Sequence, residues 1–206
     1  MAKRSYSMER RAALEAKTRE RIVRATVALH AEHGASATSY GMIAKRAQVA
    51  PQTVYNHFPD LAALLGACTG HVMEQAPALG VETFRSGRSA AARLAQLALA
   101  VFARHAYLAP WMRRGWYEAV LVPELGAILA QGHASLRQLI ATAVAPEREP
   151  TAGFVDAASV LLSFPAWQEL TRHRSNSKAA RIAADCLADL LPRLTRPPSR
   201  KAKSKS

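Results

Sequence analysis

Residues 38–58 contain two short helical patterns separated by about three residues, and this spacing constrains the fold more than any other part of the chain. Val49 can fill the corner between the two helices, and Pro51 suits the first position of the second helix, where a missing N–H costs nothing. The pattern predicts a helix-turn-helix motif whose second helix covers residues 51–57. Apolar spacing gives each helix one face for a core, formed by Ile43, Ala44 and Ala47 in the first and by Val54 and Phe58 in the second.

The outward face of that second helix is polar without being mostly charged. Its members are Gln52, Thr53, Tyr55, Asn56 and His57. Amide side chains can bond adenine through two hydrogen bonds, so we expect Gln52 and Asn56 to contact base edges. Thr53 can contact a thymine methyl group or a phosphate. For Tyr55, the alternative to a DNA contact is a half-buried place in the core. The composition of this face predicts double-stranded DNA as its partner.

Several stretches of the chain resemble the amino-terminal domain of TetR-family transcriptional regulators. They are I-V-R-A-T-V-A-L-H-A-E-H-G at residues 22–34, A-T-S at 37–39, I-A-K-R-A at 43–47 and T-V-Y-N-H-F at 53–58. The resemblance implies an all-α fold, with a three-helix DNA-binding head followed by a larger helical domain for ligand binding and dimerisation. It also implies a homodimeric repressor that binds a pseudo-palindromic operator and leaves it when a small apolar effector binds.

The same resemblance adds further DNA contacts around the motif. Tyr55 and His57 resemble the family's phosphate-binding pair, and Tyr40 occupies a family position that approaches bases. Hydroxyl groups at the start of the first helix can cap it and also lie close to where a phosphate would bind. Lys45 and Arg46 can reach the DNA backbone. The complete predicted DNA-binding set is Thr38, Ser39, Tyr40, Lys45, Gln52, Thr53, Tyr55, Asn56 and His57.

The sequence departs from the family pattern at three places. The family usually has Gly in the turn where this chain has Gln48, and a left-handed conformation there costs roughly 1–2 kcal/mol. It usually has Ser as the N-cap of the second helix, where Ala50 offers no oxygen, a loss of about 1 kcal/mol. The family often has a phosphate-binding Lys near the start of the fourth helix. This chain has Pro59, Asp60 and Leu61 there, so the residue that usually makes this phosphate contact is absent from that stretch.

The charge of the chain is concentrated at its two ends. The formal net charge is +13, of which residues 1–24 contribute +5 and residues 193–206 contribute +6. Basic ends attract a polyanion and speed the encounter with it. We expect a flexible basic arm over residues 1–16 and a disordered basic tail over residues 195–206. Two alternatives stay open: solvated tails that aid solubility, or a nucleic-acid-binding protein without sequence preference that the ends alone drive.

Several functional classes find no support in the sequence. No Ser/His/Asp, Cys/His or phosphate-loop arrangement is present, and Cys68 and Cys186 lie among apolar helical residues, as buried thiols do. His30 and His33 have a spacing that could bind a metal ion, but no third ligand is close in sequence. The first residues lack the apolar segment of a signal peptide, and no window of about 18 apolar residues predicts a membrane span. We expect a cytoplasmic, non-enzymatic protein with no cofactor and no membrane contact.

Helical patterns continue through the rest of the chain, with interruptions expected at Pro123 and Gly132 and a kink at Pro165. Aromatic residues on these helices could line a small-molecule site, or they could equally fill an ordinary core. His105 lies in an apolar stripe, where a hydrogen-bonded core histidine is the alternative to a ligand contact. The predicted pocket residues are Phe102, His105, Trp111, Met112, Trp116, Tyr117 and Trp167.

The last two predicted helices, at about residues 153–173 and 177–192, are rich in alanine and leucine. In the TetR family, two such helices pair with their copies in a four-helix dimer interface, and packing within the chain is the alternative. The predicted interface residues are Leu162, Ala166, Ala183, Leu187, Leu190 and Leu191. The predicted division of the chain is an arm at 1–16, a DNA-binding head at 17–65, a ligand-binding and dimerisation domain at 66–194, and a tail at 195–206.

Overall fold

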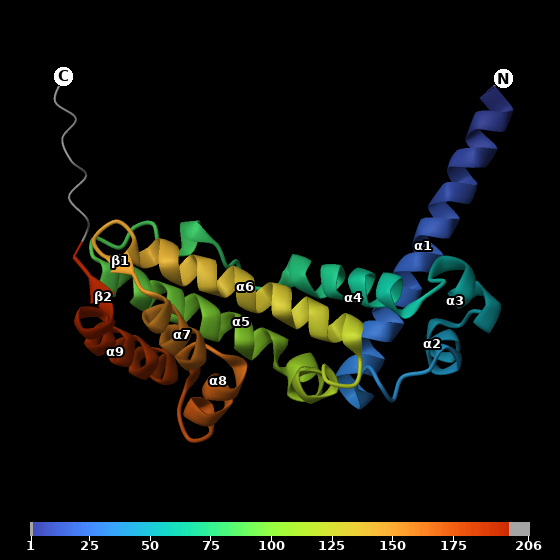
Figure 1. Cartoon of the computed structure of the whole chain (residues 1–206). Coiled ribbons are helices and arrows are strands. Elements are labelled where there is room, and N and C mark those ends of the chain that lie inside the picture. Colours follow the sequence, from blue (N-terminus) through green and yellow to red (C-terminus); the bar gives the residue numbers. More distant parts are fainter. Residues whose placement is uncertain (1, 198–206) are drawn as a thin grey trace. The chain divides into compact units, whose positions relative to one another are not determined.

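The computed structural model describes residues 2–197, and these residues are almost entirely helical, which confirms the predicted all-α class (Figure 1). The elements are α1 (Ala2–His33), α2 (Tyr40–Ala47), α3 (Pro51–His57), α4 (Leu61–Gln75), the short 3-10 helix η1 (Val81–Thr83), α5 (Ala90–Glu118), α6 (Pro123–Val144), β1 (Glu149–Pro150), α7 (Ala152–Leu161), α8 (Phe164–Thr171), α9 (Asn176–Leu194) and β2 (Thr195–Arg196).

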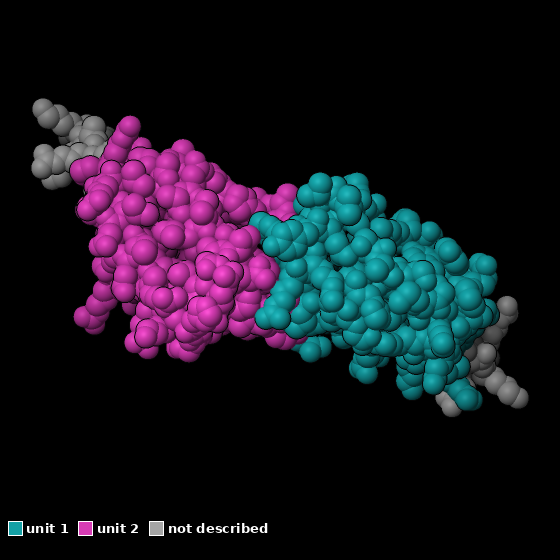
Figure 2. Space-filling model, turned by 90° about the horizontal axis from the view of Figure 1, so that it is seen from below, with its two compact units in different colours: residues 1–75, 110–128 teal, residues 76–109, 129–206 magenta. Residues whose placement is uncertain are grey.

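The chain divides into two compact units, which Figure 2 shows in different colours. Unit 1 comprises residues 1–75 and 110–128, and unit 2 comprises residues 76–109 and 129–206. The predicted head at 17–65 lies within unit 1, but the predicted boundary at residue 65 falls inside α4. Unit 1 also includes the end of α5 and the beginning of α6.

The first helix is longer than the sequence pattern indicated. α1 begins at Ala2, so the predicted flexible arm at 1–16 is helical as far as the structure describes it. The run R-R-A-A-L-E-A-K at residues 10–17 consists of residues with high helix propensity, and these allow α1 to extend without a core to pack against. α1 ends at Gly34, which has φ +90° and donates its N–H to the carbonyl of His30 at 3.0 Å. A glycine in this left-handed conformation is a common way for a helix to end.

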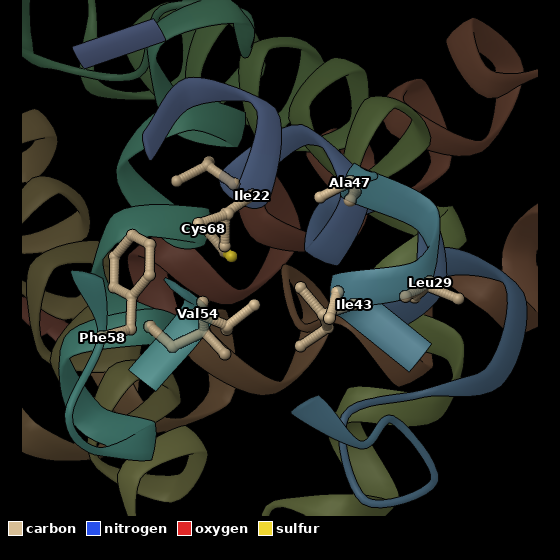
Figure 3. Packing of buried hydrophobic residues seen from close by; sticks show 11 residues of the cluster. Ile22, Leu29, Ile43, Ala47, Val54, Phe58 and Cys68 are labelled. Atoms are coloured by element: carbon tan, nitrogen blue, oxygen red, sulfur yellow. The ribbon is translucent and has the colours of Figure 1, made fainter. Parts of the chain in front are cut away.

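The core of unit 1 brings together apolar side chains from the first four helices (Figure 3). The labelled members are Ile22, Leu29, Ile43, Ala47, Val54, Phe58 and Cys68, and each is at most 6% exposed. Burial raises the pKa of the Cys68 thiol to about 12, so this cysteine is an inert core residue, as predicted. Cys186 on α9 is exposed instead, which corrects its predicted burial.

Of the breaks predicted for the later helices, the one at Pro123 is confirmed, whereas those at Gly132 and Pro165 differ in the structure. α5 continues through Pro110 as far as Glu118, and α6 starts at Pro123 and runs through Gly132 without interruption. Pro165 does not kink one helix but lies in the first turn of α8, where Ser163 is the N-cap and accepts a hydrogen bond from the Ala166 N–H at 3.3 Å. A proline is tolerated there because its missing N–H has no helical partner to lose.

Unit 2 is closed by a short antiparallel pair of strands. Glu149 pairs with Arg196, and Pro150 pairs with Thr195. Thr151 then caps α7 and donates its hydroxyl to the carbonyl of Leu194. Residues 195 and 196 of the predicted disordered tail are therefore part of a strand pair, and residues 198–206 of that tail lie outside the described part of the chain.

Within the described residues, no single helix combines the length and apolar composition of a membrane span. Taken together across their bend, α5 and α6 pass the same test of length and composition.

Candidate nucleic-acid interface

The start of α2 is built from hydroxyl groups that already have partners inside unit 1. Ser39 is the N-cap of α2, and its Oγ accepts a hydrogen bond from the Met42 N–H at 3.2 Å. Thr38 donates from Oγ1 to the carbonyl of Gly34 at 2.6 Å. The predicted cap is confirmed for Ser39, and phosphate contact by either hydroxyl stays a prediction. Ser39 is exposed and Thr38 is half-buried, so both lie at the surface where α2 begins.

The turn between α2 and α3 adopts a conformation that usually favours glycine. Gln48 has φ 54° and ψ 50°. This is the left-handed region, which is costly for a residue other than glycine. The N–H of Gln48 donates to the Lys45 carbonyl at 3.3 Å, and the N–H of Val49 donates to the Ala44 carbonyl at 3.0 Å. Arg21 of α1 donates from Nη2 to the Gln48 carbonyl at 3.2 Å. These bonds hold the turn in place although it lacks a glycine.

The recognition helix α3 turns its apolar side to the core and its polar side outward. Val54 is fully buried and Phe58 is 1% exposed. Gln52 and Asn56 are exposed, and Gln52 donates from Nε2 to Asn56 Oδ1 at 3.0 Å. Each amide has more donor and acceptor positions than this one bond uses, so the pair forms a row of hydrogen-bonding groups one turn long. Thr53 and His57 flank this row and are partly exposed.

Tyr40 supports α3 from α2. Its hydroxyl donates to the carbonyl of Phe58 at 3.1 Å, and its ring lies 4.6 Å from the ring of Tyr55. Burial is the main cause that raises the pKa of Tyr40, which keeps the hydroxyl a donor. Tyr40 was expected to approach bases, but its hydroxyl is engaged with the end of α3. The aromatic side chain that α3 presents outward is Tyr55, which is 51% exposed and not a core residue.

The two basic residues near the end of α2 differ in their partners. Arg46 donates from Nη1 and Nη2 to the two carboxylate oxygens of Glu32 at 2.6 and 2.7 Å. This bidentate pair lowers the pKa of Glu32 and raises the pKa of Arg46. Lys45 is exposed on the same helix. We therefore keep Lys45 as the predicted phosphate contact, whereas Arg46 holds α2 against α1.

Two arginines of α1 contact the motif in a way that the sequence did not indicate. The guanidinium of Arg19 lies over the ring of Phe58, with Cζ 4.9 Å from the ring centre. Arg21 contacts the Gln48 carbonyl on the other side of α3. Both side chains are exposed, so they place positive charge next to both ends of the recognition helix. These arginines are distant from the motif in sequence, so no local pattern indicated the contacts.

Among the described residues, no group of three or more His, Cys, Asp or Glu side chains could hold a metal ion. His30 is 9% exposed, and its burial lowers its pKa, an effect that the nearby Glu118 carboxylate partly opposes. His30 is thus a buried histidine whose surroundings disfavour its charged form.

The predicted pocket residues fall into two groups. Phe102, His105 and Trp167 lie together in unit 2 with Phe164, which the sequence analysis did not include. His105 contacts the carbonyl of Leu162 through Nε2 at 2.9 Å, and burial lowers its pKa. The cluster has two polar groups. One is His105, with aromatic rings 5.6 to 6.4 Å from its own ring, and the other is the indole N–H of Trp167, which donates to Asn176 Oδ1 at 2.7 Å.

The other predicted pocket residues belong to unit 1. Trp111 donates from Nε1 to the Val27 carbonyl at 2.9 Å, so its indole holds the end of α5 against α1. Met112 is half-buried, while Trp116 and Tyr117 are 38% and 71% exposed. These four side chains belong to unit 1, whereas the aromatic cluster belongs to unit 2. Ligand binding at either place stays a prediction.

Most of the predicted dimer residues are already buried within unit 2. Leu162, Ala183 and Leu187 are 0% exposed and Leu191 is 7% exposed, so they pack α9 against α7 and α8 inside one chain. Only Ala166 and Leu190 of the predicted set are partly exposed. The four buried side chains pack within the chain, as the alternative to the dimer interface expects, and their part in an interface stays a prediction. Dimerisation itself remains a prediction.

Comparison with known proteins gives the same motif and the same fold. The family model "Bacterial regulatory proteins, tetR family" matches residues 22–68. A solved structure described as a TetR-family transcriptional regulator from Rhodococcus sp. is similar with a TM-score of 0.63 and 20% identity, over 85% of this chain and 99% of that one. No curated protein matches the chain significantly.

Two further solved structures extend this comparison. A TetR transcription regulator from Haloarcula marismortui has a TM-score of 0.62 and 12% identity, over 88% of this chain and 100% of that one. EbrR, a multidrug binding protein complexed with imidazole, has a TM-score of 0.58 and 17% identity, over 88% and 97% of the two chains. At these identities the structural similarities establish the fold.

Proposed function

Because the amino-terminal domain of this chain is a helix-turn-helix domain of the TetR family, on a chain with the fold of TetR-family transcriptional regulators, we propose that the protein is a repressor that binds a pseudo-palindromic operator as a homodimer. The observation that carries this proposal is the polar face of α3. Gln52, Tyr55 and Asn56 are exposed there, whereas Val54 of the same helix is fully buried.

The proposed contacts divide into base contacts and phosphate contacts. Gln52 and Asn56 offer paired amides for base edges in the major groove. Lys45, Tyr55 and the hydroxyls at the start of α2 contact phosphates, which position the head but carry no sequence information. A seven-residue helix reads few base pairs by itself. Two heads at a spacing of about 34–36 Å, or a multiple of it, would read two symmetric half-sites.

The proposed release of the operator involves the aromatic cluster of unit 2. The cluster combines apolar rings with one neutral histidine, which is a composition that suits a small apolar effector. EbrR, which has the same fold, is a multidrug binding protein. An effector shifts the protein away from its DNA-binding arrangement only if it binds the other arrangement more tightly. The function is one of binding without catalysis, and it places the protein in the cytoplasm with the DNA.

The proposal is tested by selecting bound fragments from random DNA with the full-length protein and then measuring the mass of the complex in solution. The expected result is a symmetric sequence with two half-sites that carries two copies of the chain. Apolar compounds are then titrated against this complex, and at least one class should dissociate it. Binding to all fragments alike, with a steep dependence on salt, would instead identify a sequence-indifferent protein driven by its basic ends. A single copy on the selected DNA would contradict the homodimer.

A further inference from the structure

We propose that Glu118, the last residue of α5, is a positioning residue that holds the connection between α1 and α2 in its DNA-binding geometry. This inference rests on the proposed function. It adds to that function a residue that lies 82 positions along the chain from Ser36, which belongs to the positioned segment. The segment is the connection at residues 34–39, whose end carries the Ser39 cap of α2. Glu118 and this connection both belong to unit 1.

Both oxygens of the Glu118 carboxylate are used by the connection. Oε2 accepts a hydrogen bond from the backbone N–H of Ala35 at 2.8 Å, and Oε1 accepts one from the hydroxyl of Ser36 at 2.6 Å. Hydrogen bonds to an ionised acceptor are about twice as strong as neutral ones. The two bonds together fix the orientation of the carboxylate as well as the position of the connection.

The glycine that ends α1 leaves the space for this carboxylate. A Cβ at Gly34 would lie 2.2 Å from Oε1 and 2.9 Å from Cδ of Glu118, which is closer than atoms can approach. Gly34 also has φ +90°, a conformation that other residues avoid. The backbone conformation by itself favours a glycine at this position, and the packing of Glu118 against it is a second reason.

Two other residues on the same face of α5 contact α1. Trp111 donates to the Val27 carbonyl at 2.9 Å, and Arg114 donates from Nη1 to the Ala31 carbonyl at 3.1 Å. The spacing of these residues and Glu118, at i, i+3 and i+7, places all three along one face of the helix. Each of the three residues makes a hydrogen bond to a backbone group of α1 or of the connection. The end of α5 therefore holds the path of the main chain, whatever side chains α1 carries.

The position of the connection is passed on to α2 by short hydrogen bonds. The Thr38 N–H donates to the Ala35 carbonyl at 3.3 Å, and the Thr38 hydroxyl donates to the Gly34 carbonyl at 2.6 Å. Ser39 follows directly and caps α2. A carboxylate that fixes Ala35 and Ser36 thus also fixes the place where α2 begins, and with it the hydroxyls proposed to contact phosphate.

The test compares Glu118→Ala with the exposed unit 1 control Glu74→Ala in the full-length protein, on an operator selected with the wild type. We expect Glu118→Ala to weaken operator binding by about tenfold, within the range seen for residues that couple through others, at a temperature where both variants are folded. The slope of log affinity against log salt should fall by about one, as for one lost phosphate contact, with the base preference unchanged. Glu74→Ala should match the wild type in all three measurements.

A milder variant separates positioning from folding. Ser36→Ala removes one of the two hydrogen bonds and leaves Glu118 in place, so it should weaken operator binding less than Glu118→Ala does. Combined with Glu118→Ala it should add nothing, because both changes remove the same contact. Amide hydrogen exchange at Ala35, measured without DNA, should be faster in the Glu118 variant and unchanged in the control.

Four outcomes would overturn the inference. Faster exchange at Ala35 with wild-type affinity and salt slope would show that the carboxylate only stabilises the fold. Additive effects of Ser36→Ala and Glu118→Ala would show that they do not act through one contact. If the wild type itself has no preference among DNA sequences, the proposed function fails and this inference fails with it. If the wild type has that preference and Glu118→Ala binds the operator as tightly as the wild type does, only the inference fails.

Discussion

The two short helices of the motif have nearly the same length but are held in the head in different ways. α2 has a side-chain cap from Ser39 and a bidentate ion pair between Arg46 and Glu32 of α1. α3 has no side-chain cap, because Ala50 stands at its N-cap, and its exposed amides bond only to each other. The difference indicates that α2 fixes the motif in the head, while α3 keeps its polar groups for another molecule.

The largest effect is expected on the free energy of unfolding, from a substitution at a buried position of α2. Ile43 on α2 is 1% exposed, and Ile43→Ala should lower the free energy of unfolding by about 2–5 kcal/mol. Urea unfolding of the full-length protein measures this loss, and Leu14→Ala, at a 63% exposed position of α1, is the control. A loss similar to that of the control would contradict the role assigned to α2.

The next effect concerns affinity and leaves stability unchanged. Gln52→Ala or Asn56→Ala should each weaken operator binding by about one to two orders of magnitude, since a good base contact contributes about 1–3 kcal/mol of discrimination. Both side chains are exposed, so the melting temperature should stay the same. Gln131→Ala, at an exposed amide of α6, is the matched control. If neither substitution changes the affinity, the recognition helix has been assigned incorrectly.

A smaller effect comes from exchanging the caps of the two helices. Ala50→Ser gives α3 the side-chain oxygen that it lacks and should stabilise the protein by about 1 kcal/mol. Ser39→Ala removes the oxygen that accepts from the Met42 N–H and should destabilise it by about the same amount. Thermal unfolding of the two variants measures both changes. Equal shifts in the same direction would show that the caps do not distinguish the helices.

The smallest effect is the dependence of the α2 ion pair on pH. Arg46 lowers the pKa of Glu32 below its usual value of 4.5, so the pair stabilises the fold above pH 4.5 and loses this contribution as the pH falls through the lowered pKa. Glu32→Gln should therefore melt at a slightly lower temperature than the wild type near neutral pH. The difference should shrink at more acidic pH and in high salt, because both side chains are partly exposed. A difference that stays constant with pH would exclude this ion pair as its cause.

The local part of this architecture could be predicted from the sequence. The Ser39 cap, the Gly34 stop, Pro51 at the start of α3 and the left-handed Gln48 follow from rules that act within a few residues. The polar face of α3 follows from the same short-range periodicity.

The long-range contacts could not be predicted. Glu118 reaches Ala35 across 83 residues, and no pattern near either residue indicates the other. The same holds for Arg46 and Glu32: the sequence allowed Arg46 a contact with the DNA backbone, whereas the structure pairs it with Glu32, and the contact of Lys45 with DNA stays a prediction. The alanine-rich pattern of α9 indicated a buried face correctly, but periodicity alone does not tell packing within a chain from packing between chains.

The central claim is that the exposed amides of α3 read bases, and competition between operator and random DNA at one fixed salt concentration tests it most directly. The account predicts that the wild type prefers the operator by about a thousandfold or more, as sequence-specific proteins do. In the double variant Gln52→Ala/Asn56→Ala this preference should largely disappear while binding to random DNA stays the same. A double variant that keeps the full preference would contradict the account.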